Sequence, residues 1–191
     1  MAILPAFAIL AEDNSDKEFL SIVLRRYYQS DNMTIKGKGY GGCSEMLRKG
    51  QRDVEAWLRK GVGRFVICHD ADKSSPDSVY TDVIKRIVQP AGLERVCCIV
   101  VPVEEIEAWV IADEEAVCHV IPTFLFKGHH NPETISDPKE WLIAKSRAAN
   151  GKPLYSPATF NPAVARHLRL DVVAKKCQSF TRFLGDLDFL R

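Results

Sequence analysis

Four short apolar segments, each followed by a stretch with helical periodicity, constrain the fold of this chain more than any other feature. The first, residues 7–11, is apolar at every position, which is typical of a parallel strand covered on both faces. The others lie at residues 33–36, 64–69 and 96–101. Strands that alternate with helices favour a doubly wound α/β fold with a mainly parallel four-stranded sheet and right-handed crossovers.

The segments between the strands carry recognisable helix signals. Ser15 and Glu18 have the spacing of a capping box, which predicts a helix that begins there. Two further helices are expected, one capped by Ser44 and one over residues 79–88. The glycine-rich residues 37–42 predict a flexible loop between the second strand and the second helix.

The pattern changes after the fourth strand. Residues 104–116 are expected to be helical, and the rest of the chain shows short helical segments separated by polar loops. We therefore expect an α/β core over residues 1–121. Residues 122–191 are expected to form a mostly helical C-terminal extension of the same domain.

Composition narrows the class of protein. The 191 residues are 46% hydrophobic and 27% charged, a globular balance that argues against a disordered, fibrous or membrane-spanning chain. The formal net charge of +1 excludes a global basic field, so nucleic-acid binding would need a local patch or metal ions. None of the six cysteines forms a Cys-x-x-Cys pair, which favours a reducing cytoplasm over a zinc ribbon.

Carboxylates follow two of the predicted strands. Glu12 follows the first strand, and Asp70 and Asp72 follow the third. In an open parallel sheet these ends form the ligand-binding edge, and residues two apart in an extended segment share a face. Carboxylates gathered in a crevice repel one another unless a cation is bound, and oxygen ligands favour Mg²⁺ or Mn²⁺. The pattern predicts phosphoryl transfer or phosphodiester hydrolysis, with helix capping as the alternative role for these acids.

These residues resemble a Toprim domain, the metal-binding fold of topoisomerases, primases and OLD-type nucleases. That family has a glutamate after its first strand and an Asp-x-Asp after a later strand, matched here by Glu12, Asp70 and Asp72. The resemblance covers residues 6–101. The family's glutamate is commonly followed by glycine, whereas Asp13 stands here, so a tight phosphate-binding turn is not expected.

A second stretch, Glu105-Ile-Glu107-Ala-Trp109, is similar to a small Toprim-like family of uncharacterised bacterial proteins. Pro132-Glu133 and Asp137-Pro138-Lys139 fit the same family. Its members resemble nuclease partners of ATPases in phage-defence operons. This resemblance implies a cytoplasmic nuclease, with DNA a better candidate than RNA, and an ATPase partner. It also implies that Glu105 or Glu107 is a further metal ligand.

Several basic and aromatic residues are candidates for substrate contacts. Lys73 lies beside the acidic motif, where it can contact a phosphate, and Lys38 and Tyr40 in the glycine-rich loop can contact a nucleic-acid backbone or base. OLD-type nucleases use a lysine near their metals, and the resemblance favours Lys152, in a loop, over Lys139 for that role. A solvated surface position is the alternative for each lysine.

Three functions follow from these patterns. The leading hypothesis is a metal-dependent nuclease in which Asp70 and Asp72 hold one ion and Glu12 helps to hold a second or acts as general base. The alternatives are a haloacid-dehalogenase-like phosphohydrolase with Asp70 as nucleophile, and a non-catalytic binding subunit of an ATPase complex. His69 is expected to pack under the sheet, away from Asp70, and no cysteine has an activating motif.

Overall fold

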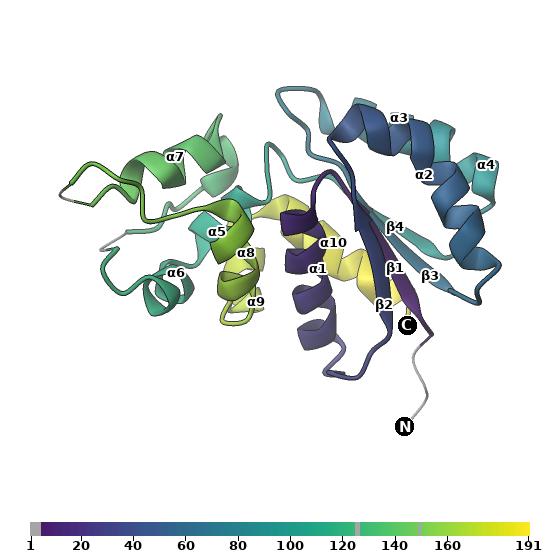
Figure 1. Cartoon of the computed structure of the whole chain (residues 1–191), viewed down its shortest axis with the longest axis horizontal. Helices are drawn as coiled ribbons and strands as arrows, with labels where there is room; N and C mark the ends of the chain where they lie inside the picture. The colour runs from purple at the N-terminus through teal and green to yellow at the C-terminus, as the bar shows by residue number, and fades with distance from the viewer. Residues whose placement is uncertain (1–4, 125–126, 149) are drawn as a thin grey trace.

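A computed structural model describes residues 5–124, 127–148 and 150–191 of the chain. Its centre is a four-stranded parallel sheet, as the sequence predicts, and the strands follow the order β2-β1-β3-β4 (Figure 1). The strands are β1 Phe7–Ala11, β2 Ile35–Gly39, β3 Arg64–Cys68 and β4 Cys97–Val100. The principal helices are α1 Asn14–Tyr27, α2 Cys43–Leu58, α3 Pro76–Val83, α4 Gln89–Ala91, α5 Glu107–Ala112, α6 Glu114–Val120, α7 Pro138–Lys145, α8 Pro157–Ala165, α9 Leu170–Lys176 and α10 Gln178–Phe189.

Both faces of the sheet are covered, which explains why β1 is apolar throughout. Alternate residues of a strand point to opposite faces. Phe7, Ile9 and Ala11 belong to a core shared with α1 and the C-terminal helices, while Ala8 and Leu10 belong to a second core beneath α2 and α3. Helices α2–α4 accordingly lie on one side of the sheet, and α1 and α10 lie on the other (Figure 1).

The C-terminal extension packs onto the α1 side of the sheet. Helix α10 contacts β4, α8 contacts α1, and helices α5 to α9 form a group beside α1 (Figure 1). The buried indole of Trp109 is surrounded by Phe19, Phe180 and Phe183, and its Nε1 donates to Oγ of Ser179 at 2.8 Å. One apolar core therefore joins the first strand to the last helix.

Three local predictions are wrong in detail. Helix α1 is capped by Asp13, whose Oδ1 accepts from the main-chain N–H of Asp16 at 3.0 Å, whereas Ser15 lies inside the helix. The predicted helix over residues 104–116 is two helices, because Asp113 ends α5 and caps α6 by accepting from Ala116 N at 3.3 Å.

The third error concerns the glycine-rich segment. Gly37 and Gly39 lie in β2, which extends beyond the predicted strand, and not in a loop. A Cβ on Gly39 would lie 2.3 Å from the main-chain N of Asn14, so only glycine lets β2 approach the start of α1 this closely. The glycines serve sheet packing and leave no phosphate-binding loop at these positions.

Candidate metal centre

The candidate site lies at the carboxyl ends of β1 and β3, the two central strands. The chain adds β2 on one side of β1 and then adds β3 and β4 on the other side of β1. The strand order therefore reverses between β1 and β3. Ligands of doubly wound folds bind at such a point. The N–H of Asp70 donates to Oε1 of Glu12 at 2.8 Å, so residues 58 apart in sequence meet here, as predicted.

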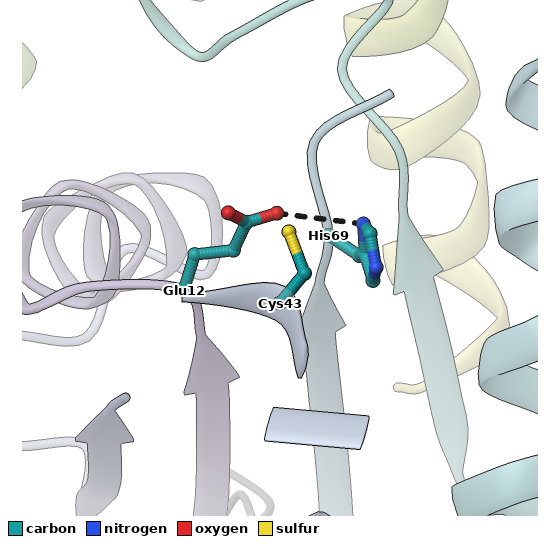
Figure 2. Close-up of side chains that lie close together, drawn as sticks. All are labelled: Glu12, Cys43 and His69. Atoms are coloured by element: carbon teal, nitrogen blue, oxygen red, sulfur yellow. Dashed lines mark ion pairs between the residues drawn. The ribbon is translucent and has the colours of Figure 1, made fainter. Parts of the chain in front are cut away.

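A carboxylate, a thiol and an imidazole converge at this edge. Glu12, Cys43 and His69 each offer a ligand atom, and these atoms lie within 4.8 Å of one another (Figure 2). His69 Nδ1 lies 3.4 Å from Oε1 of Glu12 and 2.7 Å from the main-chain oxygen of Asp70. This group could hold a metal ion. His69 is buried but faces the site, so the prediction that it packs away from Asp70 is wrong.

Cys43 reaches the site from the face of the sheet that α2 covers, opposite to α1. It is the first residue of α2 and follows Gly42, whose φ of 103° turns the chain from β2 across the carboxyl edge of the sheet. Its Sγ lies 3.8 Å from Oδ2 of Asp72. Burial and the neighbouring carboxylates of Glu12 and Asp72 raise the pKa of the Cys43 thiol, so it carries its proton at neutral pH unless a cation displaces it.

Asp70 is the most constrained acid of the site. Its Oδ1 is buried, and no hydrogen-bond partner reaches it from the residues that the structure describes. Burial raises its pKa well above the usual range, and further increases come from the charges of Asp16, Glu12, Glu107 and Asp72. A buried acceptor without a partner is costly, so this atom points to a ligand or to a retained proton.

Asp16 belongs to the site but was missed in the sequence. It lies in the first turn of α1, buried, four residues after Glu12. Burial raises its pKa to about 8, with contributions from Asp13, Glu107 and Glu12. Asp16 lies between the two residues of the predicted capping box, and its spacing of four residues from Glu12 is the one signal in the sequence for a role in the site. We call Glu12, Asp16, Asp70 and Glu107 the acidic cluster.

Both glutamates of the Glu-x-Glu motif lie near the cluster, with Glu107 on the inside. Glu107 begins α5 and is only 4% exposed, and burial raises its pKa. Its Oε1 accepts from Nδ2 of Asn161 at 3.0 Å, and the hydroxyl of Tyr155 donates to Oδ1 of that asparagine. Glu105, in the preceding loop, is half-buried, and its Oε2 accepts from the main-chain N–H of Lys139 at 2.9 Å.

Lys139, not Lys152, is the lysine beside the acids. Burial alone would lower the pKa of Lys139, but the charges of Glu107, Glu105 and other nearby acids outweigh burial and raise it. Lys152 is exposed in a loop, where its main-chain N–H donates to Oδ1 of Asn150 at 3.0 Å. The position of its charge beside the acids therefore favours Lys139 over Lys152 as the lysine of the site.

Asp72 and Lys73 form the rim of the site. Both have positive φ, 44° and 65°, so the segment after β3 is a left-handed turn and not the extended segment expected for Asp-x-Asp. Asp72 is exposed, whereas Asp70 points into the protein. The N–H of Lys73 donates to Oε2 of Glu104 at 3.1 Å, and its Nζ lies 3.2 Å from Oδ1 of Asp137.

Lys38 and Tyr40 both contact the carboxylate of Asp53. The Lys38 ammonium lies 2.7 Å from Oδ2 of Asp53, and the Tyr40 hydroxyl donates to the same oxygen at 2.8 Å. The Tyr40 ring is only 6% exposed, so it has no open face on which a base could stack. These residues join β2 to α2. Burial of Tyr40 argues against base stacking there, whereas a phosphate contact by Lys38 stays a prediction.

A separate cavity of about 490 Å³ opens beside β4. Apolar residues of β4 form one wall, and the guanidinium of Arg182 lies 5.0 Å from the ring centre of Tyr80 on another. Pro76 and Val103 also line it.

A known protein family matches most of the chain. Residues 11–188 match the family described as Domain of unknown function (DUF4276). The chain belongs to this family. The matched region contains every residue of the acidic cluster, together with Cys43, His69 and Lys139. No curated protein and no solved structure matches the chain. Among the described residues of this DUF4276 protein, no helix is both long and apolar enough to cross a membrane.

Proposed function

We propose that this DUF4276 protein is a Mg²⁺- or Mn²⁺-dependent nuclease of the Toprim type that hydrolyses phosphodiester bonds, with DNA as the first substrate to test. The observation that carries the proposal is the buried Oδ1 of Asp70, which has no hydrogen-bond partner among the described residues. The Asp70 carboxyl group lies at the carboxyl edge of the sheet, and the charges of Glu12, Asp16 and Glu107 each raise its pKa.

The donor set fits a divalent cation. Within the described part of the chain, the charge of Lys139 acts on Asp16 and Glu107, and one ammonium does not balance the four acids of the cluster. Asp70 and Glu107 offer oxygen donors from the inside, and Asp72 offers one at the rim. Oxygen donors favour Mg²⁺ or Mn²⁺, which in hydrolytic sites polarises phosphoryl oxygens and lowers the pKa of water.

The remaining residues have definable tasks in hydrolysis. Glu12 is held by the N–H of Asp70, which leaves its other oxygen available to accept a proton from an attacking water. The Lys139 ammonium, beside Glu105 and Glu107, suits a contact with a phosphate oxygen. The cavity beside β4, where Arg182 lies over Tyr80, is a further place where a nucleotide of the substrate would fit.

The test is cleavage of plasmid DNA, single-stranded DNA and RNA by the purified chain, with Mn²⁺, with Mg²⁺ and with EDTA. We expect metal-dependent cleavage that Asp70→Asn abolishes. Asp82→Asn, a matched change at an exposed position of α3, should leave cleavage intact. No cleavage of any substrate, together with metal-dependent DNA binding, would instead favour the non-catalytic subunit of an ATPase complex.

A further inference from the structure

The group formed by Glu12, Cys43 and His69 differs chemically from the acidic cluster, with which it shares only Glu12. A thiolate and an imidazole are poor ligands for Mg²⁺ but strong ligands for zinc and similar ions. We propose that these three side chains form a Zn²⁺ site, separate from the hard-ion site at Asp70 and Glu107. This inference goes beyond the proposed hydrolysis and does not depend on it.

The geometry requires two local adjustments, at the Cys43 thiol and at the His69 ring nitrogen. The three ligand atoms lie within 4.8 Å of one another (Figure 2). Bond lengths of 2.0 to 2.3 Å at a tetrahedral zinc ion place its ligand atoms about 3.3–3.8 Å apart. The pair His69 Nδ1 and Glu12 Oε1, at 3.4 Å, already has that separation. The remaining separations close if the Cys43 side chain turns away from Oδ2 of Asp72, which its Sγ faces at 3.8 Å.

The Glu12 carboxylate is already held in position by a main-chain hydrogen bond. The N–H of Asp70 fixes Oε1 of Glu12, as an outer-shell donor commonly does for a carboxylate ligand. His69 Nδ1 lies 2.7 Å from the main-chain oxygen of Asp70, an acceptor, so zinc would have to take the place of the proton that Nδ1 donates there, and His69 would then carry its proton on Nε2. Cys43 would bind as thiolate and release its proton to solvent, so zinc binding should strengthen as the pH rises. With three protein ligands, the fourth position remains open to water or substrate.

Zinc at this site would engage Glu12, which the proposed hydrolysis needs as a proton acceptor. Zinc should therefore inhibit a Mg²⁺- or Mn²⁺-supported reaction by binding at Cys43 and His69. A cysteine at the entrance of the site thus makes the protein responsive to the zinc level. Inhibition is a consequence of the site and not its test, because binding can be measured without any activity.

Cobalt(II) is the direct probe, since a Co²⁺–thiolate bond gives a near-ultraviolet charge-transfer band that oxygen ligands do not give. We expect the full chain to develop this band with one equivalent of Co²⁺, and Zn²⁺ to displace it while millimolar Mg²⁺ does not. Cys43→Ser should abolish the band and weaken Zn²⁺ binding, measured by calorimetry, at least about 100-fold, since outer-shell changes alone cost 10–100-fold.

Two controls keep the result specific to this site. Cys118→Ser changes another partly exposed thiol and should keep the band and the zinc affinity. His69→Gln should keep the charge-transfer band but weaken zinc binding, and its thermal unfolding will show whether it is folded. Absence of the band in the wild-type chain, or its persistence in Cys43→Ser, would overturn the proposal whether or not the protein cleaves DNA.

Discussion

The main-chain N–H of Asp70 donates a hydrogen bond of 2.8 Å to Oε1 of Glu12. This bond ties the end of β3 to the end of β1, and it uses the side chain of one acid and the backbone of the other. The carboxylate of Asp70 is consequently free to face the protein interior, where its Oδ1 is buried. The two acids are therefore not equivalent, and substitution should separate their roles.

Glu12→Gln should cut turnover at least about 100-fold while nucleic-acid binding is retained. Glutamine can still accept the bond from Asp70 N–H, so the shape of the edge is kept, but the basic oxygen is lost. Loss of a general base costs about 10²–10⁴ in rate. Plasmid-cleavage time courses and DNA-binding titrations would measure the two effects. Cleavage at the wild-type rate would show that Glu12 has only a structural role.

Lys139→Ala and Lys152→Ala form a matched pair. The charge of Lys139 lies beside Glu105 and Glu107, whereas Lys152 lies in an exposed loop. We expect Lys139→Ala to reduce cleavage at least about tenfold, the scale of one charge-assisted hydrogen bond to a phosphate. Lys152→Ala should match the wild type in the same assay. The reverse pattern would restore the sequence-based assignment of Lys152.

The sheet was predictable because its signal is local. A strand buried on both faces must be apolar, and the chain shows this at Phe7–Ala11 without any knowledge of partners. The start of β2 at Ile35 and the place of its glycines inside the strand were not predictable. Gly39 is required there because β2 lies against the start of α1, a contact that the local sequence does not reveal. The break at Asp113 has the same origin, because its carboxylate pairs with Arg169, 56 residues away.

The candidate site was predictable only in part, for a related reason. Glu12 and Asp70 directly follow apolar strands, so strand geometry alone places them at one edge. Cys43 and His69 carry no spacing signal, because α2 and β3 bring them together through the tertiary fold. Lys139 likewise reaches the acids only because α7 packs against α5. Sequence patterns identified the edge of the sheet, and tertiary packing determines which side chains complete it.

Glu133→Ala should destabilise the fold rather than alter the chemistry. The Glu133 carboxylate accepts from the N–H groups of Gln178 at 2.7 Å and Ser179 at 2.9 Å, so it caps α10 from a distant segment. It also accepts from the Ser179 hydroxyl, which itself accepts from the buried indole of Trp109.

Loss of a helix cap costs about 0.5–2 kcal/mol, so we expect the free energy of unfolding of Glu133→Ala in urea to fall by that amount. Glu140→Ala, at an exposed position of α7, is the control and should change it by less than about 0.5 kcal/mol. Wild-type stability in Glu133→Ala would mean that this contact does not support α10.

The stability of the chain in EDTA should fall as the pH rises from about 5 to 8. The pKa of Asp16 is about 8 in the folded protein, against an ordinary value of 3.8. Between these values the folded state binds more protons than the unfolded state, so the free energy of unfolding decreases with pH. One proton contributes at most about 1.4 kcal/mol per pH unit. Asp113 acts with the opposite sign, but only between its lowered pKa and its ordinary value of 3.8, which is below this range. His167, whose pKa is lowered, also acts with the opposite sign, below its ordinary value of 6.5.

Asp16→Asn isolates this effect, because the amide has no proton to lose and other titrating groups cancel in the comparison. We expect the difference in unfolding free energy, Asp16→Asn minus wild type, to grow from pH 5 to pH 8. Urea titrations at pH 5, 6.5 and 8 would measure it. Saturating Mn²⁺ should flatten the wild-type profile, since a cation replaces the proton. A difference that does not change with pH would show that Asp16 is ionised throughout and that the acidic cluster is not coupled as described.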